Sequence, residues 1–285
     1  MEPQLIADYA CQVGEGPVWH PMEKRVYWLD IPQGRMFRYE PANGKHEMCY
    51  EGIQVGGITV QADGSLLLYM EKGAIAVWRN GKLSYIVKEI PAERDHRFND
   101  VFTDPAGRVF CGTMATKGNP GRLYRLDLDG SIHVALDNVG ISNGGDFTPD
   151  RKQMYYTDST PRRIYLFDYD QKTGAISNQR TFVETPGSED GPDGMTVDAQ
   201  GYVWSARWDG WRLIRYTPKG VEERSVKFPA RKVSSVCFGG DDLTDMYVTT
   251  AGGQDKVANG PGAGALFKVN LGIKGAPEPF SRVGL

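Results

Sequence analysis

The sequence predicts an all-β fold, a six-bladed β-propeller with four antiparallel strands per blade and a ring closed by an N-terminal strand. A strand–turn–strand pattern that recurs six times is the first observation behind this prediction. The second is the content of 35 glycines, 14 tyrosines and 6 tryptophans, which is typical of short aromatic strands between tight turns. The third observation is that no stretch long enough to form a helix has apolar residues repeating every 3.6 positions, so we expect almost no helix. We expect residues 1–285 to form a single propeller domain.

The repeated unit is a short apolar strand, a polar turn, and a second strand rich in Tyr, Trp, Val or Leu. Its six copies begin at Val18, Ile58, Val101, Asp146, Met195 and Val236. Equivalent positions in successive copies are 40, 43, 45, 49 and 41 residues apart, which is the length of a propeller blade.

A second hairpin follows each copy. Its first strands start at Gly34, Gly73, Gly121, Arg162, Trp211 and Gly264. The dipeptides Asn43–Gly44, Asn80–Gly81 and Asp129–Gly130 then supply the positive φ that tight hairpins require. The run 5–9 precedes the first copy, and we expect it to add a strand to the sixth blade and so cover an open edge. The other all-β architecture, two stacked sandwiches, would need a linker near the midpoint, and the sequence has none.

Composition excludes several classes of function. Lys and Arg number 33 against 36 Asp and Glu, a net charge of −3, so we expect no nucleic-acid partner. No apolar run approaches 18 residues, so we expect no membrane partner. The N-terminus lacks a basic start with an apolar region behind it, and the cysteines stand far apart without a C-x-x-C pair, which predicts reduced thiols and a cytoplasmic location. We expect a monomer or a weak homo-oligomer.

Chemistry is expected where the repeats differ, at the residues just before each first strand, which lie at one mouth of a propeller's channel. Four of the six copies place a carboxylate or an amide there, namely Glu15, Asn99, Asn143 and Asp193. Asn-Gly and Asp-Gly are by themselves ordinary turns, but a glutamate between two glycines has little value in a turn. Two carboxylates and two amide oxygens suit a hard divalent cation, and no histidine falls at these positions. The sequence therefore predicts one bound divalent cation, with Ca, Zn, Mg, Mn and Fe(II) as the alternatives.

Five segments of the chain resemble the SMP-30/gluconolactonase/luciferin-regenerating-enzyme family, which includes regucalcin. These segments are GEGPVW, RFNDVFTDPAGRVFCGTM, SNGGDFTPDRKQMYYTDS, PDGMTVDAQGYVWSAR and SSVCFGG. The resemblance runs from about Gly14 to Val269. It implies a six-bladed propeller with one divalent cation in the channel and an activity that hydrolyses sugar-acid lactones. By matching motifs, it implies Glu15, Asn143 and Asp193 as metal ligands and Arg97 as a contact of the substrate's oxygens. It places Asn99 near the metal or in contact with the substrate.

One segment departs from the family pattern. In regucalcin-like members the segment after the GTM motif is longer and supplies a further acidic substrate contact. Residues 115–121 here are short and contain no carboxylate. The substrate preference of those members therefore does not transfer to this chain.

These residues predict a metal-assisted hydrolysis. The cation would polarise the lactone carbonyl, Asp193 would act as the general base or orient the water, and Arg97 would bind substrate oxygens. No G-x-S-x-G motif occurs, so we expect no acyl-enzyme. Two alternatives stay open: a phosphotriester or fluorophosphate hydrolase on the same metal site, and a non-catalytic calcium-binding propeller. A polar ring in the channel argues against the second, because scaffold propellers use their outer faces.

Overall fold

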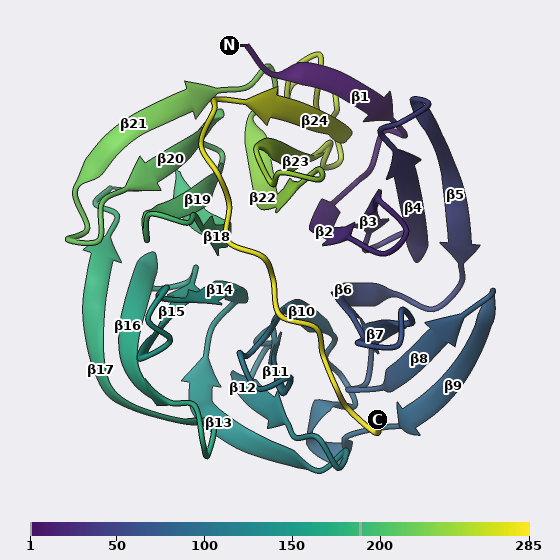
Figure 1. Ribbon diagram of the computed structural model, residues 1–285, viewed down its shortest axis with the longest axis vertical. Coiled ribbons are helices and arrows are strands. Elements are labelled where there is room, and N and C mark those ends of the chain that lie inside the picture. Colours follow the sequence, from purple (N-terminus) through teal and green to yellow (C-terminus); the bar gives the residue numbers. More distant parts are fainter. Residues whose placement is uncertain (1, 188–189) are drawn as a thin grey trace. The chain divides into compact units, whose positions relative to one another are not determined.

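The computed structural model describes residues 2–187 and 190–285, and their fold is a six-bladed β-propeller built from six four-stranded antiparallel sheets (Figure 1). The predicted fold class is therefore confirmed. One 3-10 turn, η1 (Pro91–Glu93), is the only helical element in the described residues, as the missing 3.6-residue period predicted. No helix in this part of the chain has the length and apolarity needed to cross a membrane.

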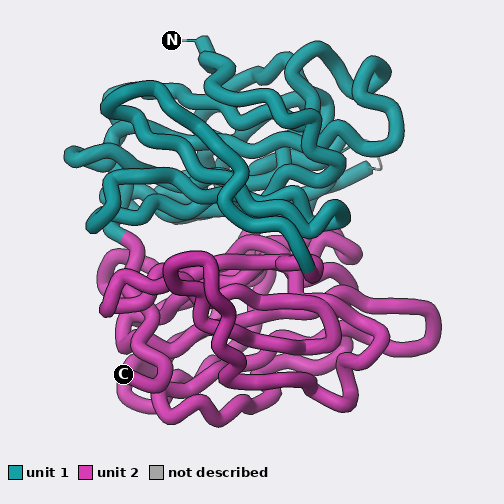
Figure 2. The backbone as a smooth tube through the Cα atoms, turned by 90° about the vertical axis from the view of Figure 1, so that its right-hand side faces the viewer, with its two compact units in different colours: residues 1–52, 185–277 teal, residues 53–184, 278–285 magenta. Residues whose placement is uncertain are grey.

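The chain divides into two compact units, residues 1–52 with 185–277 and residues 53–184 with 278–285 (Figure 2). Unit 1 contains three sheets, with the strands β2 (Gly14–His20), β3 (Arg25–Asp30), β4 (Arg35–Glu40) and β5 (Lys45–Glu51); β18 (Gly191–Val197), β19 (Val203–Trp208), β20 (Arg212–Tyr216) and β21 (Glu222–Lys227); and β22 (Lys232–Gly239), β23 (Asp245–Ala251), β24 (Ala265–Asn270) and β1 (Gln4–Asp8).

Unit 2 contains the other three sheets. Their strands are β6 (Val55–Val60), β7 (Leu66–Met70), β8 (Ile75–Arg79) and β9 (Lys82–Val87); β10 (Phe98–Thr103), β11 (Val109–Thr113), β12 (Gly121–Leu126) and β13 (Ile132–Val139); and β14 (Ser142–Phe147), β15 (Gln153–Asp158), β16 (Arg163–Asp170) and β17 (Ala175–Glu184).

Burial falls from the first strand of a sheet to the fourth. The first strand β6 is buried at every residue, whereas the fourth strand β5 has four consecutive exposed residues. Apolar side chains of the inner strands pack between neighbouring sheets, as Trp204 and Phe267 do in unit 1 and Tyr69 and Val109 do in unit 2. A polar group on a first strand is therefore enclosed and needs a partner or a ligand there.

The N-terminal strand completes the sixth sheet, as predicted. β1 pairs antiparallel with β24, from Gln4 opposite Lys268 to Asp8 opposite Ala265, one residue earlier than the expected range. Buried Ala7 adds to the core of unit 1. This pairing covers the edge of β24 that would otherwise offer unpaired backbone groups.

Of the three predicted dipeptide turns, only Asn80–Gly81 has positive φ at both residues; Asn43–Gly44 and Asp129–Gly130 have it at the glycine, with φ of 71° and 84°. Asn80 and Gly81, with φ of 51° and 76°, join β8 to β9 directly between Arg79 and Lys82. Both central residues thus adopt the left-handed conformation that a two-residue hairpin requires.

The C-terminal segment was not predicted to form structure. Gly275 pairs with Asp198 in unit 1, and Ser281 forms a parallel bridge with Gln61 in unit 2. The four cysteines are free thiols, as expected from their spacing.

Candidate functional site

The first strand of every sheet contains a register shift, and the predicted site residues lie at these shifts. Asn99, Asn143 and Asp193 each begin a two-residue stretch that stands opposite a single residue of the neighbouring strand. Glu15 immediately precedes the corresponding stretch in β2. A β-bulge of this kind turns a side chain out of the regular alternation of the strand, and bulges are common beside active sites.

In unit 2, three of the predicted residues form one hydrogen-bonded chain. Arg97 Nη1 donates to Asn99 Oδ1 at 2.6 Å, and Asn99 Nδ2 donates to Asn143 Oδ1 at 2.6 Å. Asn99 Nδ2 also donates to the carbonyl of Ser142 at 2.7 Å, which fixes the orientation of its amide. Asn143 Nδ2 in turn donates to Ser159 Oγ at 2.6 Å. An amide oxygen has two lone pairs, so Asn143 Oδ1 can accept this bond and still ligate a cation.

In unit 1, the two predicted carboxylates lie on strands that both pack against β22. Glu15 on β2 is 3% exposed and Asp193 on β18 is 5% exposed. Short side chains of β22 contact both strands: Ser234 Oγ donates to the carbonyl of Gly14 at 2.5 Å, and a Cβ on Gly194 would lie 2.1 Å from Ser235 Oγ. Burial of ionised carboxylates is costly unless they are paired or ligate a cation, so both residues fit a ligand set made of oxygens.

The donor set is of the oxygen type. No group of three or more His, Cys, Asp and Glu suited to a metal ion occurs among residues 2–187 and 190–285. The predicted ligands instead combine two carboxylates with amide oxygens, which hard cations such as Ca²⁺ and Mg²⁺ accept.

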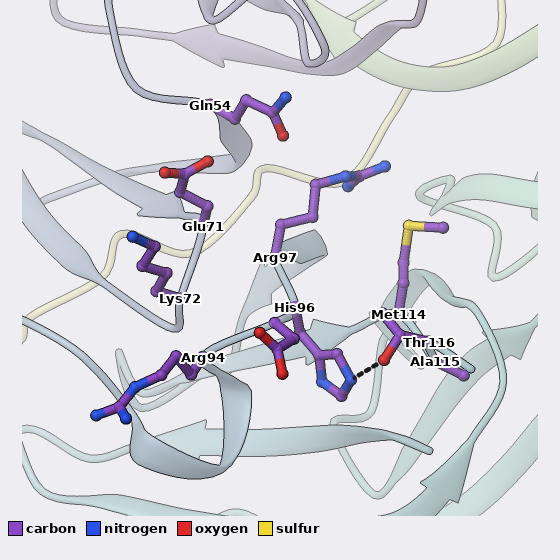
Figure 3. A pocket seen from close by; sticks show the side chains of 10 residues that line it. Gln54, Glu71, Lys72, Arg94, His96, Arg97, Met114, Ala115 and Thr116 are labelled. Atoms are coloured by element: carbon purple, nitrogen blue, oxygen red, sulfur yellow. Dashed lines mark hydrogen bonds between the residues drawn. The ribbon is translucent and has the colours of Figure 1, made fainter. Parts of the chain in front are cut away.

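Arg97 connects the amide chain to a pocket of unit 2 with a volume of about 320 Å³ (Figure 3). The residues that line it are Gln54, Glu71, Lys72, Arg94, Asp95, His96, Arg97, Met114, Ala115 and Thr116. Arg97 is half-buried and its backbone bridges to Glu71. Next to the pocket, burial raises the pKa of Asp100 to about 7, and the charge of Arg97 opposes this increase. The Arg97 guanidinium, which is held by its hydrogen bond to Asn99, can donate to oxygens of a bound ligand.

His96, which lines the pocket, pairs with the buried Glu93 behind it, and sequence reasoning missed this pair. Glu93 is fully buried, and its Oε1 accepts hydrogen bonds from Arg122 Nη1 at 2.7 Å and Tyr124 OH at 2.6 Å. Its Oε2 contacts His96 Nδ1, and His96 Nε2 lies 2.9 Å from Thr116 Oγ1. The only sequence signal was the position of His96 beside Arg97, since His96 lies outside the positions aligned at the channel mouth.

Hydrogen bonds keep the Glu93 carboxylate charged. Burial by itself would raise the pKa of Glu93, but hydrogen bonds from Tyr124, His96 and Arg122 outweigh burial and hold the pKa below its ordinary value of 4.5. Glu93 is therefore ionised at neutral pH.

The fold and these residues define a β-propeller whose inner strands carry buried carboxylates in unit 1 and buried amides in unit 2, where Arg97 lines a pocket. The chain belongs to the SMP-30/gluconolactonase/LRE-like family, whose model matches residues 13–252. It is 45% identical to pentonolactonase XacC from Haloferax volcanii over 98% of both chains, and 36% identical to regucalcin from Gallus gallus over 95% of both. The structure of a luciferin-regenerating enzyme superimposes with a TM-score of 0.89 at 32% identity and covers 99% of this chain and 100% of that one. The family resemblance found in the motifs is thereby confirmed.

Proposed function

We propose that the protein is a divalent-cation-dependent hydrolase that opens sugar-acid lactones. The observation that carries this proposal is the 45% identity, over 98% of both chains, to a protein named as a pentonolactonase. The buried carboxylates and amides of the first strands and the pocket beside Arg97 support it. A small-molecule lactone is accordingly the proposed substrate.

We assign Glu15, Asn143 and Asp193 as the residues that would hold the cation. When bound, a divalent cation supplies a Lewis acid that polarises the ester carbonyl and stabilises negative charge on its oxygen. Arg97 donates hydrogen bonds to substrate oxygens, and Asn99 holds both Arg97 and Asn143 in place while facing the substrate.

In the proposed reaction, the Asp193 carboxylate accepts a proton from the attacking water, whose oxygen forms a bond to the carbonyl carbon. The bond between the carbonyl carbon and the ring oxygen breaks, and the proton goes to that ring oxygen. The product is the open hydroxy acid, and no covalent enzyme intermediate is formed.

The test is hydrolysis of gluconolactone, xylonolactone, galactonolactone and diisopropyl fluorophosphate. Each is assayed after chelation and again after single additions of Ca²⁺, Mg²⁺, Mn²⁺, Zn²⁺ and Fe²⁺. We expect one sugar lactone to be opened far faster than the rest, only with a cation present. Turnover of the fluorophosphate alone would favour the phosphotriesterase alternative.

The second candidate function, a non-catalytic calcium-binding propeller, is favoured by the 36% identity to a relative named regucalcin. Tight calcium binding without turnover of any substrate in the panel would establish it and contradict the lactonase.

The role of Asp193 is tested by Asp193→Ala, with Asp241→Ala as the matched control on the surface of the same unit. Asp241 is largely exposed and pairs with the exposed Lys24. We expect Asp193→Ala to abolish turnover and leave the circular dichroism spectrum unchanged, and Asp241→Ala to keep full activity. Turnover by folded, cation-free Asp193→Ala would contradict the mechanism.

We also propose a cytoplasmic location, which four free thiols support because such thiols persist in reducing compartments. A monomer or weak homo-oligomer is the expected state, to be measured by light scattering on the eluted protein.

A further inference from the structure

We propose that Thr116 is a specificity-determining residue that accepts a hydrogen bond from a substrate hydroxyl, and that His96 and Glu93 are the positioning residues that leave its oxygen free to do so. The inference rests on the proposed function, because it concerns the sugar part of the same substrate. It assigns a role to the short segment after the GTM motif, which carries no carboxylate.

Glu93 is ionised and a carboxylate only accepts, so the ring nitrogen that faces it, His96 Nδ1, carries the hydrogen. The other ring nitrogen, His96 Nε2, forms the 2.9 Å hydrogen bond with Thr116 Oγ1. A hydroxyl oxygen has two lone pairs, so whichever of these two atoms donates, the Thr116 oxygen keeps a lone pair that can accept a hydrogen bond from a ligand.

The segment that carries Thr116 is held firmly. Thr116 and Asn119 exchange two backbone hydrogen bonds of 2.9 and 3.1 Å, which close a small turn. Asn119 Nδ2 reaches the carbonyl of Ala92 in η1 at 3.3 Å, and the backbone N–H of Ala115 donates to the carbonyl of Gly140 at 2.7 Å. Thr116 is exposed, yet both its backbone and its hydroxyl have one orientation.

The pocket suits a ligand with several hydroxyl groups. Glu71 and Lys72 stand on one side of it, Met114 and Thr116 stand on the other, and Arg97 extends between them (Figure 3). Lys72 and Arg97 can only donate, whereas Glu71 and Thr116 offer acceptors on opposite walls. Each hydroxyl of a sugar both donates and accepts, so a polyhydroxylated lactone can satisfy both walls at once.

The test compares xylonolactone with γ-butyrolactone, which has no hydroxyl groups, as substrates of Thr116→Val and Thr116→Ser. Thr116→Val keeps the shape and removes the acceptor, so we expect KM for xylonolactone to rise about tenfold. We expect KM for γ-butyrolactone to stay unchanged. Thr116→Ser keeps the hydroxyl and should lie within about twofold of the parent for both substrates. The matched control is Lys117→Ala, an exposed residue of the same turn that does not line the pocket.

The positioning role is tested by His96→Phe and by the double variant with Thr116→Val. If His96 acts through Thr116, the double variant raises KM for xylonolactone no further than Thr116→Val alone. Circular dichroism checks that His96→Phe is folded. If it is not, Thr116→Val and Thr116→Ser still test whether Thr116 binds the substrate. Equal KM values for xylonolactone in Thr116→Val and the parent protein would overturn the inference.

A binding measurement separates this inference from the proposed function. Saturation-transfer NMR measures whether a neutral cyclic polyol, 1,5-anhydroglucitol, binds to the parent protein and to Thr116→Val. Binding that Thr116→Val abolishes, in a protein that opens no lactone, would support the role of Thr116 while the lactonase fails. Equal saturation transfer from the two proteins to 1,5-anhydroglucitol would contradict the role of Thr116.

Discussion

Glu93 shows how single side chains stabilise the wall of the pocket. Its carboxylate lies in the interior of unit 2, where three partners hold it: Arg122, Tyr124 and His96. A group whose pKa falls on folding stabilises the folded state above its ordinary pKa of 4.5, and that stabilisation is lost as the pH falls through the lower folded value.

We predict that Tyr124→Phe lowers the free energy of unfolding by about 1–2 kcal/mol at pH 7, because it removes the 2.6 Å hydrogen bond from the Tyr124 hydroxyl to Glu93. The deficit should shrink as the pH falls through the lowered pKa of folded Glu93, below 4.5, because protonation of Glu93 weakens the bond in the parent protein as well. Urea unfolding of the parent and the variant, at pH 7 and again below pH 4.5, measures this deficit in the free energy of unfolding. Tyr85→Phe, on an exposed residue of β9, is the matched control and should change little. A deficit that grows in acid would contradict this account.

At the scale of residues, the sequence identified side chains by type and repeat position, but it could not identify their partners. Asn99 and Asn143 were predicted on separate repeats, and the structure joins them by a hydrogen bond across 44 residues of chain. Glu93, His96 and Thr116 belong to no repeat position, and their contact depends on η1 meeting the turn after β11. No local periodicity reports such a contact.

At the scale of elements, the bulges of the first strands explain a difference in the repeats. The apolar pattern starts these two copies at Val101 and Asp146, which places Asn99 two residues before its copy and Asn143 three residues before its own. The register shifts instead make Asn99 and Asn143 equivalent, each two residues before pairing resumes at Val101 and Gly145. A bulge adds a residue on one strand only, so the apolar pattern alone could not fix this register.

We predict that Gly194→Ala lowers the free energy of unfolding by about 1–3 kcal/mol, because its Cβ would lie 2.1 Å from Ser235 Oγ and 2.8 Å from Ser235 Cα. The strand must shift to relieve this overlap, and the neighbouring Asp193 shifts with it, so the rise in melting temperature on adding calcium should also diminish. Gly191→Ala in the same strand β18 is the control, since a Cβ there meets no atom within 4 Å. Equal stability and equal calcium response of the two variants would refute the proposed role of the close strand approach.

At the scale of the whole molecule, the six sheets could be predicted and the course of the C-terminal segment could not. Each blade is a run of consecutive hairpins, so its signals are local: alternating apolar residues, turn glycines and the repeat spacing. The strand β1 was predictable because the last repeat lacked a fourth strand. The hydrogen bond from Gln61 Nε2 to the carbonyl of Val283 joins residues 222 positions apart, and no sequence pattern near Val283 predicts it.

The contacts of that segment lead to a prediction for unit 2. Ser281 exchanges backbone hydrogen bonds of 2.9 Å with Val60 and Ala62, and the side chain of Gln61 pairs with the backbone of Val283 at 3.0 and 3.1 Å. The Val283 side chain is 1% exposed and belongs to the core of unit 2. We therefore expect removal of residues 281–285 to destabilise unit 2 by about 3 kcal/mol or more.

Hydrogen exchange read by mass spectrometry measures this effect strand by strand. Without residues 281–285, the amides of β6 and β7 should exchange faster, because β6 leads directly into the segment that Ser281 and Val283 bind. Removal of Leu285 alone is the control, since that residue is 63% exposed and should leave exchange unchanged. Unchanged protection of β6 in the longer truncation would mean that the hairpins of unit 2 hold the first strand without the C-terminal segment.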